Sequence, residues 1–185
     1  MGGFVAQKYL ERHAAPAAVL LASIPPGGTL GVTGRMLKRR PLAVLRVNAT
    51  LSMRPFVDSG EMVGELFFGP ETPPAIVDAF YARAQNESYP AYVDSMFVTR
   101  ARPSRVKTPV LVLGARCDSI IAVDEVHRTA RRYGTKAEIY DMGHQMMLDL
   151  GWESVADRVA AWVAECEPRR ADDYELRSRR QTDDS

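Results

Sequence analysis

One carboxylate and one imidazole in this 185-residue chain are spaced so that they could act together. Asp118 follows the apolar run 109–114, and His144 follows the shorter run 137–140. If both runs are parallel strands, their carboxyl ends meet at one edge of the sheet, where such sheets bind ligands. A carboxylate that accepts from His Nδ1–H fixes the tautomer and leaves Nε2 free as a general base. We therefore take Asp118 and His144 as the candidate acid and base.

Two other aspartates could serve as the acid in place of Asp118, and each has a competing structural explanation. Asp124 is expected to open a helix that begins near residue 123. Asp141 lies three residues before His144, in what we expect to be a tight turn. Asp118 remains the preferred acid, although an aspartate after a strand is also a common turn residue.

A nucleophile for this acid and base is not obvious within the chain. Ser23 ends the apolar run 17–23, and Cys117 adjoins Asp118, where we expect it to be a packing residue. The histidines and cysteines are scattered without the spacing of metal ligands, so we expect no metal site and no cofactor. Gly27 and Gly28 follow prolines and precede no long helix, which argues against a phosphate loop.

The elements that would position these residues alternate between strand and helix. Short apolar runs bounded by turn residues predict buried strands. Apolar residues at helical spacing predict amphipathic helices. The expected strands are 17–23, 109–114 and 137–140, and the expected helices are 2–13, 123–133 and 152–166. This alternation predicts an α/β fold with a parallel sheet and right-handed crossovers.

Residues 29–105 have a different texture, because prolines and glycines cut them into short pieces. Thr72 is the expected N-cap of one piece, with Pro73 at its first helical position. Strand alternation is not evident, so we interpret this segment as a helical insertion between two strands. The expected helices are 36–47 (interrupted at Pro41), 60–68, 73–84 and 91–98.

Composition limits the classes of partner. The chain is 46% hydrophobic and 25% charged, and its net charge of +1 does not favour a nucleic-acid partner. It has no apolar run near the ~20 residues of a membrane span, and no signal peptide is recognised. Two cysteines suggest a reducing compartment, so we expect a cytoplasmic protein. Residues 167–185 are charged and lack an apolar stripe, which predicts a disordered tail.

Three stretches, taken in order, resemble the α/β-hydrolase family: Met-Gly-Gly at 1–3, Pro-Val-Leu-Val-Leu-Gly-Ala-Arg-Cys-Asp at 109–118, and Gly-His-Gln-Met-Met at 143–147. The order of acid and then histidine also matches. The resemblance implies a partial α/β-hydrolase fold of about three parallel strands with flanking helices. Residues 1–28 and 106–166 would form the core, and residues 29–105 would form the family's helical cap.

The resemblance also implies an activity, the hydrolysis of an ester, thioester or related acyl bond by a serine nucleophile. Asp118 would be the acid, His144 the base, and the backbone N–H of Met1 an oxyanion donor. The methionines and phenylalanines of the cap would favour an apolar acyl or lipid-like substrate, although they could equally be cap core. They are Met36, Met53, Met62, Phe67, Phe68 and Met96.

The family's nucleophile turn often reads Gly-His-Ser-Met-Gly-Gly, so the resemblance places the serine immediately before Met1. We therefore expect the chain alone to be inactive, and Met1 as a true N-terminus would bear an ammonium instead of an amide. An upstream half, or self-association, would cover the sheet edge left open beside 17–23. The alternatives are a non-catalytic remnant or binding module, and an intact small α/β protein unrelated to hydrolases.

Overall fold

Three parallel strands form the sheet of this protein, whose structure is a computed structural model that describes residues 1–166. The strands are β1 (Ala18–Leu21), β2 (Val110–Ala115) and β3 (Ala137–Tyr140), in the spatial order β1-β2-β3. Every strand begins within one residue of its predicted start, and both pairings are parallel. The predicted fold class is therefore confirmed, whereas the predicted tail 167–185 lies outside the described residues.

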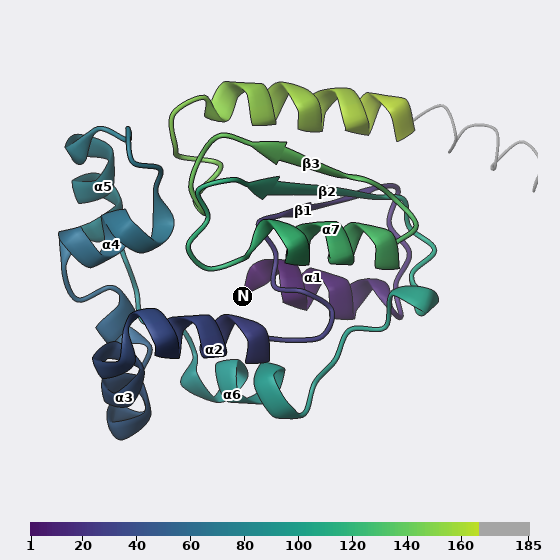
Figure 1. The fold of residues 1–185 in the computed structure, drawn as a ribbon. Helices are drawn as coiled ribbons and strands as arrows, with labels where there is room; N and C mark the ends of the chain where they lie inside the picture. The colour runs from purple at the N-terminus through teal and green to yellow at the C-terminus, as the bar shows by residue number, and fades with distance from the viewer. Residues whose placement is uncertain (167–185) are drawn as a thin grey trace, which may run out of the picture.

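Helices cover both faces of the sheet (Figure 1). Helices α1 (Gly2–Leu10) and α7 (Val123–Arg132) lie on one face, and the helix 152–166 lies on the other. All six residues of β2 are buried, because its side chains alternate between two apolar layers. Val112 belongs to the layer on the α7 side, and Leu113 to the layer on the side of the helix 152–166. A strand covered on both faces explains the continuous apolar run in the sequence.

Residues 29–105, which we call the helical segment, contain helices and no strand. In Figure 1 residues 30–81 lie beyond and below the carboxyl ends of the strands, and at residues 98–105 the segment runs back toward their amino ends. Its elements are α2 (Leu30–Arg39), α3 (Pro41–Thr50), α4 (Gly60–Phe67), α5 (Pro74–Tyr81), α6 (Tyr89–Phe97), and the 3₁₀ turns η1 (Arg54–Phe56) and η2 (Pro103–Arg105). Local chemistry starts two of them, since Ser59 caps α4 and Ser88 caps α6 through their side-chain oxygens. The division of the chain into core and cap stays a prediction.

Three helix starts differ from the prediction, those of α2, α5 and α6, and α6 begins at Tyr89 instead of Ala91. Helix α2 begins at Leu30 instead of Met36, because Gly31 and Gly34 do not interrupt it. A glycine inside a helix costs only about 1 kcal/mol, and the burial of Val32 and Met36 offsets that cost.

The predicted cap of α5 is also wrong. Pro73 occupies the N-cap position and Pro74 the first helical position. Thr72 does not cap the helix, because its hydroxyl donates to the buried carboxylate of Asp149 instead.

Three side chains lie in environments that the sequence did not predict. Cys117 is exposed instead of packed, because it lies in the turn that follows β2. Val163 on the helix 152–166 is 44% exposed although it is apolar. Glu125 on α7 is buried although it is charged, and it forms an ion pair with Arg35 of α2. Across residues 1–166, none of the helices combines the length and apolar character that crossing a membrane requires.

Candidate active site

The structure brings Asp118 and His144 together at the carboxyl end of the sheet. Asp118 follows β2 and His144 follows β3. The Nδ1 atom of His144 lies 2.8 Å from Oδ2 of Asp118, within hydrogen-bond distance. The Asp118 side chain is fully buried, whereas that of His144 is 21% exposed. The carboxylate is thus shielded from water while the imidazole can still be reached.

The turn after β2 fixes the orientation of the Asp118 carboxylate. Its Oδ1 atom accepts hydrogen bonds from the backbone N–H groups of Ile120, at 2.7 Å, and Ile121, at 2.9 Å. The other oxygen is therefore directed to His144. An ionised carboxylate can only accept hydrogen bonds, so Nδ1 must be the donor and Nε2 is left without a proton in the neutral ring. This is the tautomer that a general base requires.

The two rival aspartates are engaged elsewhere. Asp141 is 80% exposed, and its Oδ1 accepts from Arg116 Nε at 2.5 Å. Asp124 is the second residue of α7 and pairs with Arg128, whose hydrogen bond holds the pKa of this carboxyl below its ordinary value. Of the three aspartates, Asp118 is the one that is hydrogen-bonded to His144.

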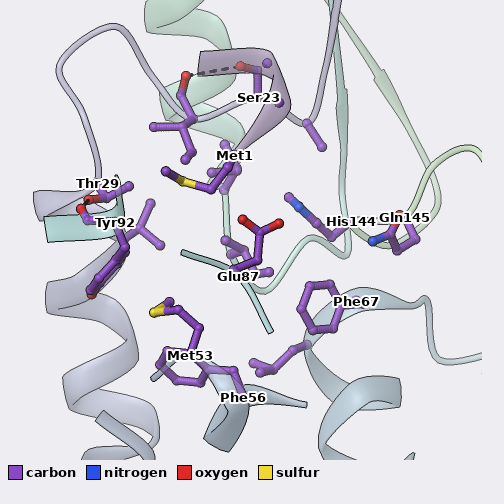
Figure 2. Close-up of a pocket in the computed structure, with 18 of the residues that line it drawn as sticks. Met1, Ser23, Thr29, Met53, Phe56, Phe67, Glu87, Tyr92, His144 and Gln145 are labelled. Atoms are coloured by element: carbon purple, nitrogen blue, oxygen red, sulfur yellow. Dashed lines mark hydrogen bonds between the residues drawn. The ribbon is translucent and has the colours of Figure 1, made fainter. Parts of the chain in front are cut away.

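A cavity of about 420 Å³ lies next to His144 (Figure 2). The imidazole points into it from one side and Phe67 lies beside the ring, with centroids 5.9 Å apart. Most of its lining is apolar and comes from the helical segment and from the residues that follow the carboxyl ends of the three strands. The lining includes Leu21, Ile24, Val32, Met36, Met53, Phe56, Val57, Leu66, Ile120, Ile121 and Met147, together with the polar residues Thr29, Gln85, Glu87, Tyr92 and Gln145.

The beginning of α1 forms another part of the same lining, through Met1, Gly2 and Gly3. Gly3 allows α1 to approach the end of β1 closely, because a Cβ there would lie 2.3 Å from Ser23 Oγ. Ser23 also lines the cavity, but its hydroxyl is held by Gln7 Nε2 at 2.9 Å. The helix start, Ser23 and His144 therefore border one space.

Buried polar residues that the sequence did not single out hold these parts in place. Gln7 is fully buried, donates to the carbonyl of Ile24 at 2.8 Å, and accepts from the Tyr133 hydroxyl at 3.1 Å. Arg35 pairs with the buried Glu125 and donates to the carbonyl of Ile120 at 2.7 Å, next to the Asp118 turn. These contacts join positions far apart in the chain, so local patterns do not predict them. The one signal in the sequence was Gln7, a polar residue on the otherwise apolar buried face of α1.

Within residues 1–166, histidine, cysteine and carboxylate side chains do not gather in a group of three or more that could hold a metal ion.

Comparison with known proteins identifies the fold. Family models and curated protein sequences gave no match to this chain. Among solved structures, an esterase from Exiguobacterium antarcticum is similar, with a TM-score of 0.60 and 18% sequence identity. The match covers 88% of this chain and 63% of the esterase, so the chain spans less than two thirds of that protein's length. At this identity the likeness shows the fold alone: the chain shares the α/β architecture of that esterase over most of the residues described.

Proposed function

We propose that this chain supplies the acid and the base of a serine hydrolase that cleaves an ester or related acyl bond. The observation that carries the proposal is the hydrogen bond from His144 Nδ1 to the buried Asp118 carboxylate at 2.8 Å, beside a cavity that can hold a substrate. The esterase-like fold supports it, because the strand ends that carry these two residues are where such sheets place their ligands.

The chemistry follows from the tautomer of His144. Its Nε2 would take the proton of a serine hydroxyl while the serine oxygen forms a bond to the acyl carbon of the substrate. The imidazolium formed would be stabilised by Asp118 and would then give its proton to the departing alcohol. A water molecule would repeat the sequence on the acyl-enzyme, with His144 again as the base, and would release the carboxylic acid.

We propose that the serine stands immediately before Met1 in the active protein, on a longer chain. The start of α1 lines the same cavity as His144, so a residue preceding Met1 would enter at the cavity wall. Two further features support an additional segment beside this region. Within residues 1–166, β1 pairs with β2 on one side only. Val5 and Tyr9 on α1 are 62% and 57% exposed.

The substrate class is proposed from the cavity. Its volume of about 420 Å³ lies within the range of about 300–1,000 Å³ that is typical of small-molecule sites. The methionines and phenylalanines of its wall, Met36, Met53, Phe56 and Phe67, favour a small apolar or lipid-like acyl group. Met62, Phe68 and Met96 do not line it: Phe68 and Met96 are buried elsewhere, and Met62 packs against the core cluster that includes Leu20 and Val112.

A fluorophosphonate probe, which reacts with activated serines, tests the proposal in cells that make the protein. We expect an adduct on a serine that directly precedes Met1 in the labelled peptide. The variants His144→Ala and Asp118→Asn should lose the label, and the exposed-residue controls His127→Ala and Asp141→Asn should keep it. An unlabelled protein, an adduct on Ser23, or labelling that survives His144→Ala would refute the proposal.

A further inference from the structure

We propose that Asp149 is a positioning residue, which fixes the turn that carries His144 by tying it to the helical segment. This inference rests on the proposed function, because it concerns the geometry of the proposed general base. Asp149 does not line the cavity, and its carboxylate is hydrogen-bonded to groups other than the imidazole, so its action would be exerted through the backbone on either side of His144.

The Asp149 carboxylate is 1% exposed and accepts four hydrogen bonds. Its Oδ2 atom accepts from the backbone N–H of Gly143 at 2.5 Å and of Gly69 at 2.8 Å. Its Oδ1 atom accepts from the backbone N–H of Leu150 at 2.8 Å and from the Thr72 hydroxyl. Burial acts to raise the pKa of Asp149, but the bonds from Thr72, Gly143 and Gly69 outweigh it and hold the pKa below its ordinary value. The ionised form is therefore the one built into the fold.

These bonds connect the His144 turn to residues 67–72 of the helical segment. Gly143, immediately before His144, is held through Asp149 together with Gly69 and Thr72. Gln145, immediately after His144, donates its backbone N–H to the carbonyl of Phe67 at 2.8 Å. Both neighbours of the histidine are thus fixed to the same short piece of chain.

The contact surface between these two pieces leaves little room for movement. A Cβ on Gly143 would lie 2.3 Å from the carbonyl carbon of Phe68 and 2.5 Å from the Gly69 nitrogen. The Phe67 ring also meets the imidazole edge-on. Asp118 orients the ring of His144, and Asp149 sets where its backbone stands. A displacement of about 1 Å in a reacting group can cost about 100-fold in rate, so the position of the His144 backbone matters as much as the orientation of its ring.

The variant Asp149→Asn tests this on the chain itself, without requiring hydrolysis. An asparagine side chain has a single acceptor oxygen, and its NH2 group would face backbone N–H groups that are also donors. We expect the hydrogen-exchange protection of the Gly143 and Gln145 amides to fall at least tenfold. We also expect the downfield NMR signal of the His144 Nδ1–H, bonded to Asp118, to weaken or vanish, while the β2 amides stay protected. Asp157→Asn, an exposed residue of the last helix, is the matched control and should change none of these signals.

A folded Asp149→Asn protein with unchanged Gly143, Gln145 and Nδ1–H signals would overturn the proposal. If that variant does not fold, Thr72→Val provides the second test, because it removes one donor and keeps the shape. It should shift the same three signals in the same direction, with Thr72→Ser restoring them, and unchanged signals in Thr72→Val would equally overturn the proposal. If the fluorophosphonate probe labels no serine before Met1, the proposed function fails, but these signals still decide whether Asp149 positions His144.

Discussion

Replacing Gly143 by alanine should damage the His144 turn although it adds a single methyl group. Carbon atoms in contact normally stand about 3.5–4.0 Å apart, whereas the new Cβ would lie 2.3 Å from the Phe68 carbonyl carbon. The turn must therefore retreat by about 1 Å from backbone atoms that cannot yield as a side chain would. That displacement stretches the bond from Gly143 to Asp149, now 2.5 Å, and the bond from Gln145 to Phe67, now 2.8 Å, beyond useful length.

The cost can be estimated from those two bonds. A hydrogen bond to a charged acceptor contributes about 1.5–3 kcal/mol and a neutral backbone bond about 0.5–1.5 kcal/mol. We therefore expect Gly143→Ala to lower the free energy of unfolding by about 2–4 kcal/mol, a large part of the 5–15 kcal/mol typical of a domain. Urea unfolding followed by circular dichroism measures it.

Gly34→Ala is the matched control for this experiment. Gly34 lies inside α2, and nothing stands within 4 Å of the Cβ that alanine would add there. The same chemical change should then raise stability, by about 0.5–1 kcal/mol, because alanine favours the helix. Equal shifts of the urea midpoint in the two variants, or an unchanged midpoint in Gly143→Ala, would contradict the predicted clash between the added Cβ and the Phe68 backbone.

Three further predictions concern the core, the cavity and pH. Leu113→Ala, at a fully buried position of β2, should cost about 2–5 kcal/mol in urea unfolding, whereas Leu42→Ala, 73% exposed, should stay within about 0.5 kcal/mol; equal effects would contradict the assigned core. Glu87→Gln removes a charge from the mainly apolar cavity lining, so an apolar fluorescent dye titrated into the protein should bind about threefold to tenfold more tightly. Glu71→Gln, outside the lining, is the control and should leave the affinity for the dye unchanged. Unchanged affinity in Glu87→Gln would contradict the prediction that the charge of Glu87 opposes binding. The pKa of Asp149 is held below its ordinary value of about 3.9, so its contribution to stability is present above that pH and is lost as the pH falls through the folded-state pKa. The urea midpoint of the wild-type protein should therefore decline below about pH 4. The midpoint of Asp149→Asn should decline less steeply over the same pH range.

The sequence revealed those parts of the molecule that local patterns determine. The strands were found because apolar runs between turn residues suit a sheet covered on both faces, and β2 is buried along its whole length. The hydrogen bond between Asp118 and His144 could be expected from the same topology, since each residue follows the carboxyl end of a parallel strand. Their roles in catalysis remain predictions that the proposed labelling experiment addresses.

The sequence could not reveal contacts between residues far apart in the chain. Asp149 binds Gly69, 80 positions away, and Thr72, 77 positions away, and neither spacing leaves a local pattern. The wrong assignment of Thr72 as a helix cap has the same origin, because a buried carboxylate competes for its hydroxyl. The ion pair of Arg35 with Glu125, 90 positions apart, likewise explains why a glutamate on α7 is buried.

The hydrogen bond to Asp118 should hold neutral His144 as the tautomer with a proton on Nδ1 and a free Nε2. A long-range ¹H–¹⁵N NMR spectrum of the histidine-labelled protein, recorded at a pH where the imidazole is neutral, measures this directly. We expect a protonated Nδ1 and an unprotonated Nε2 for His144, and loss of that preference in Asp118→Asn. A proton on Nε2 in the wild-type protein, or the same spectrum in both proteins, would contradict the assigned tautomer and with it the role of His144 as general base.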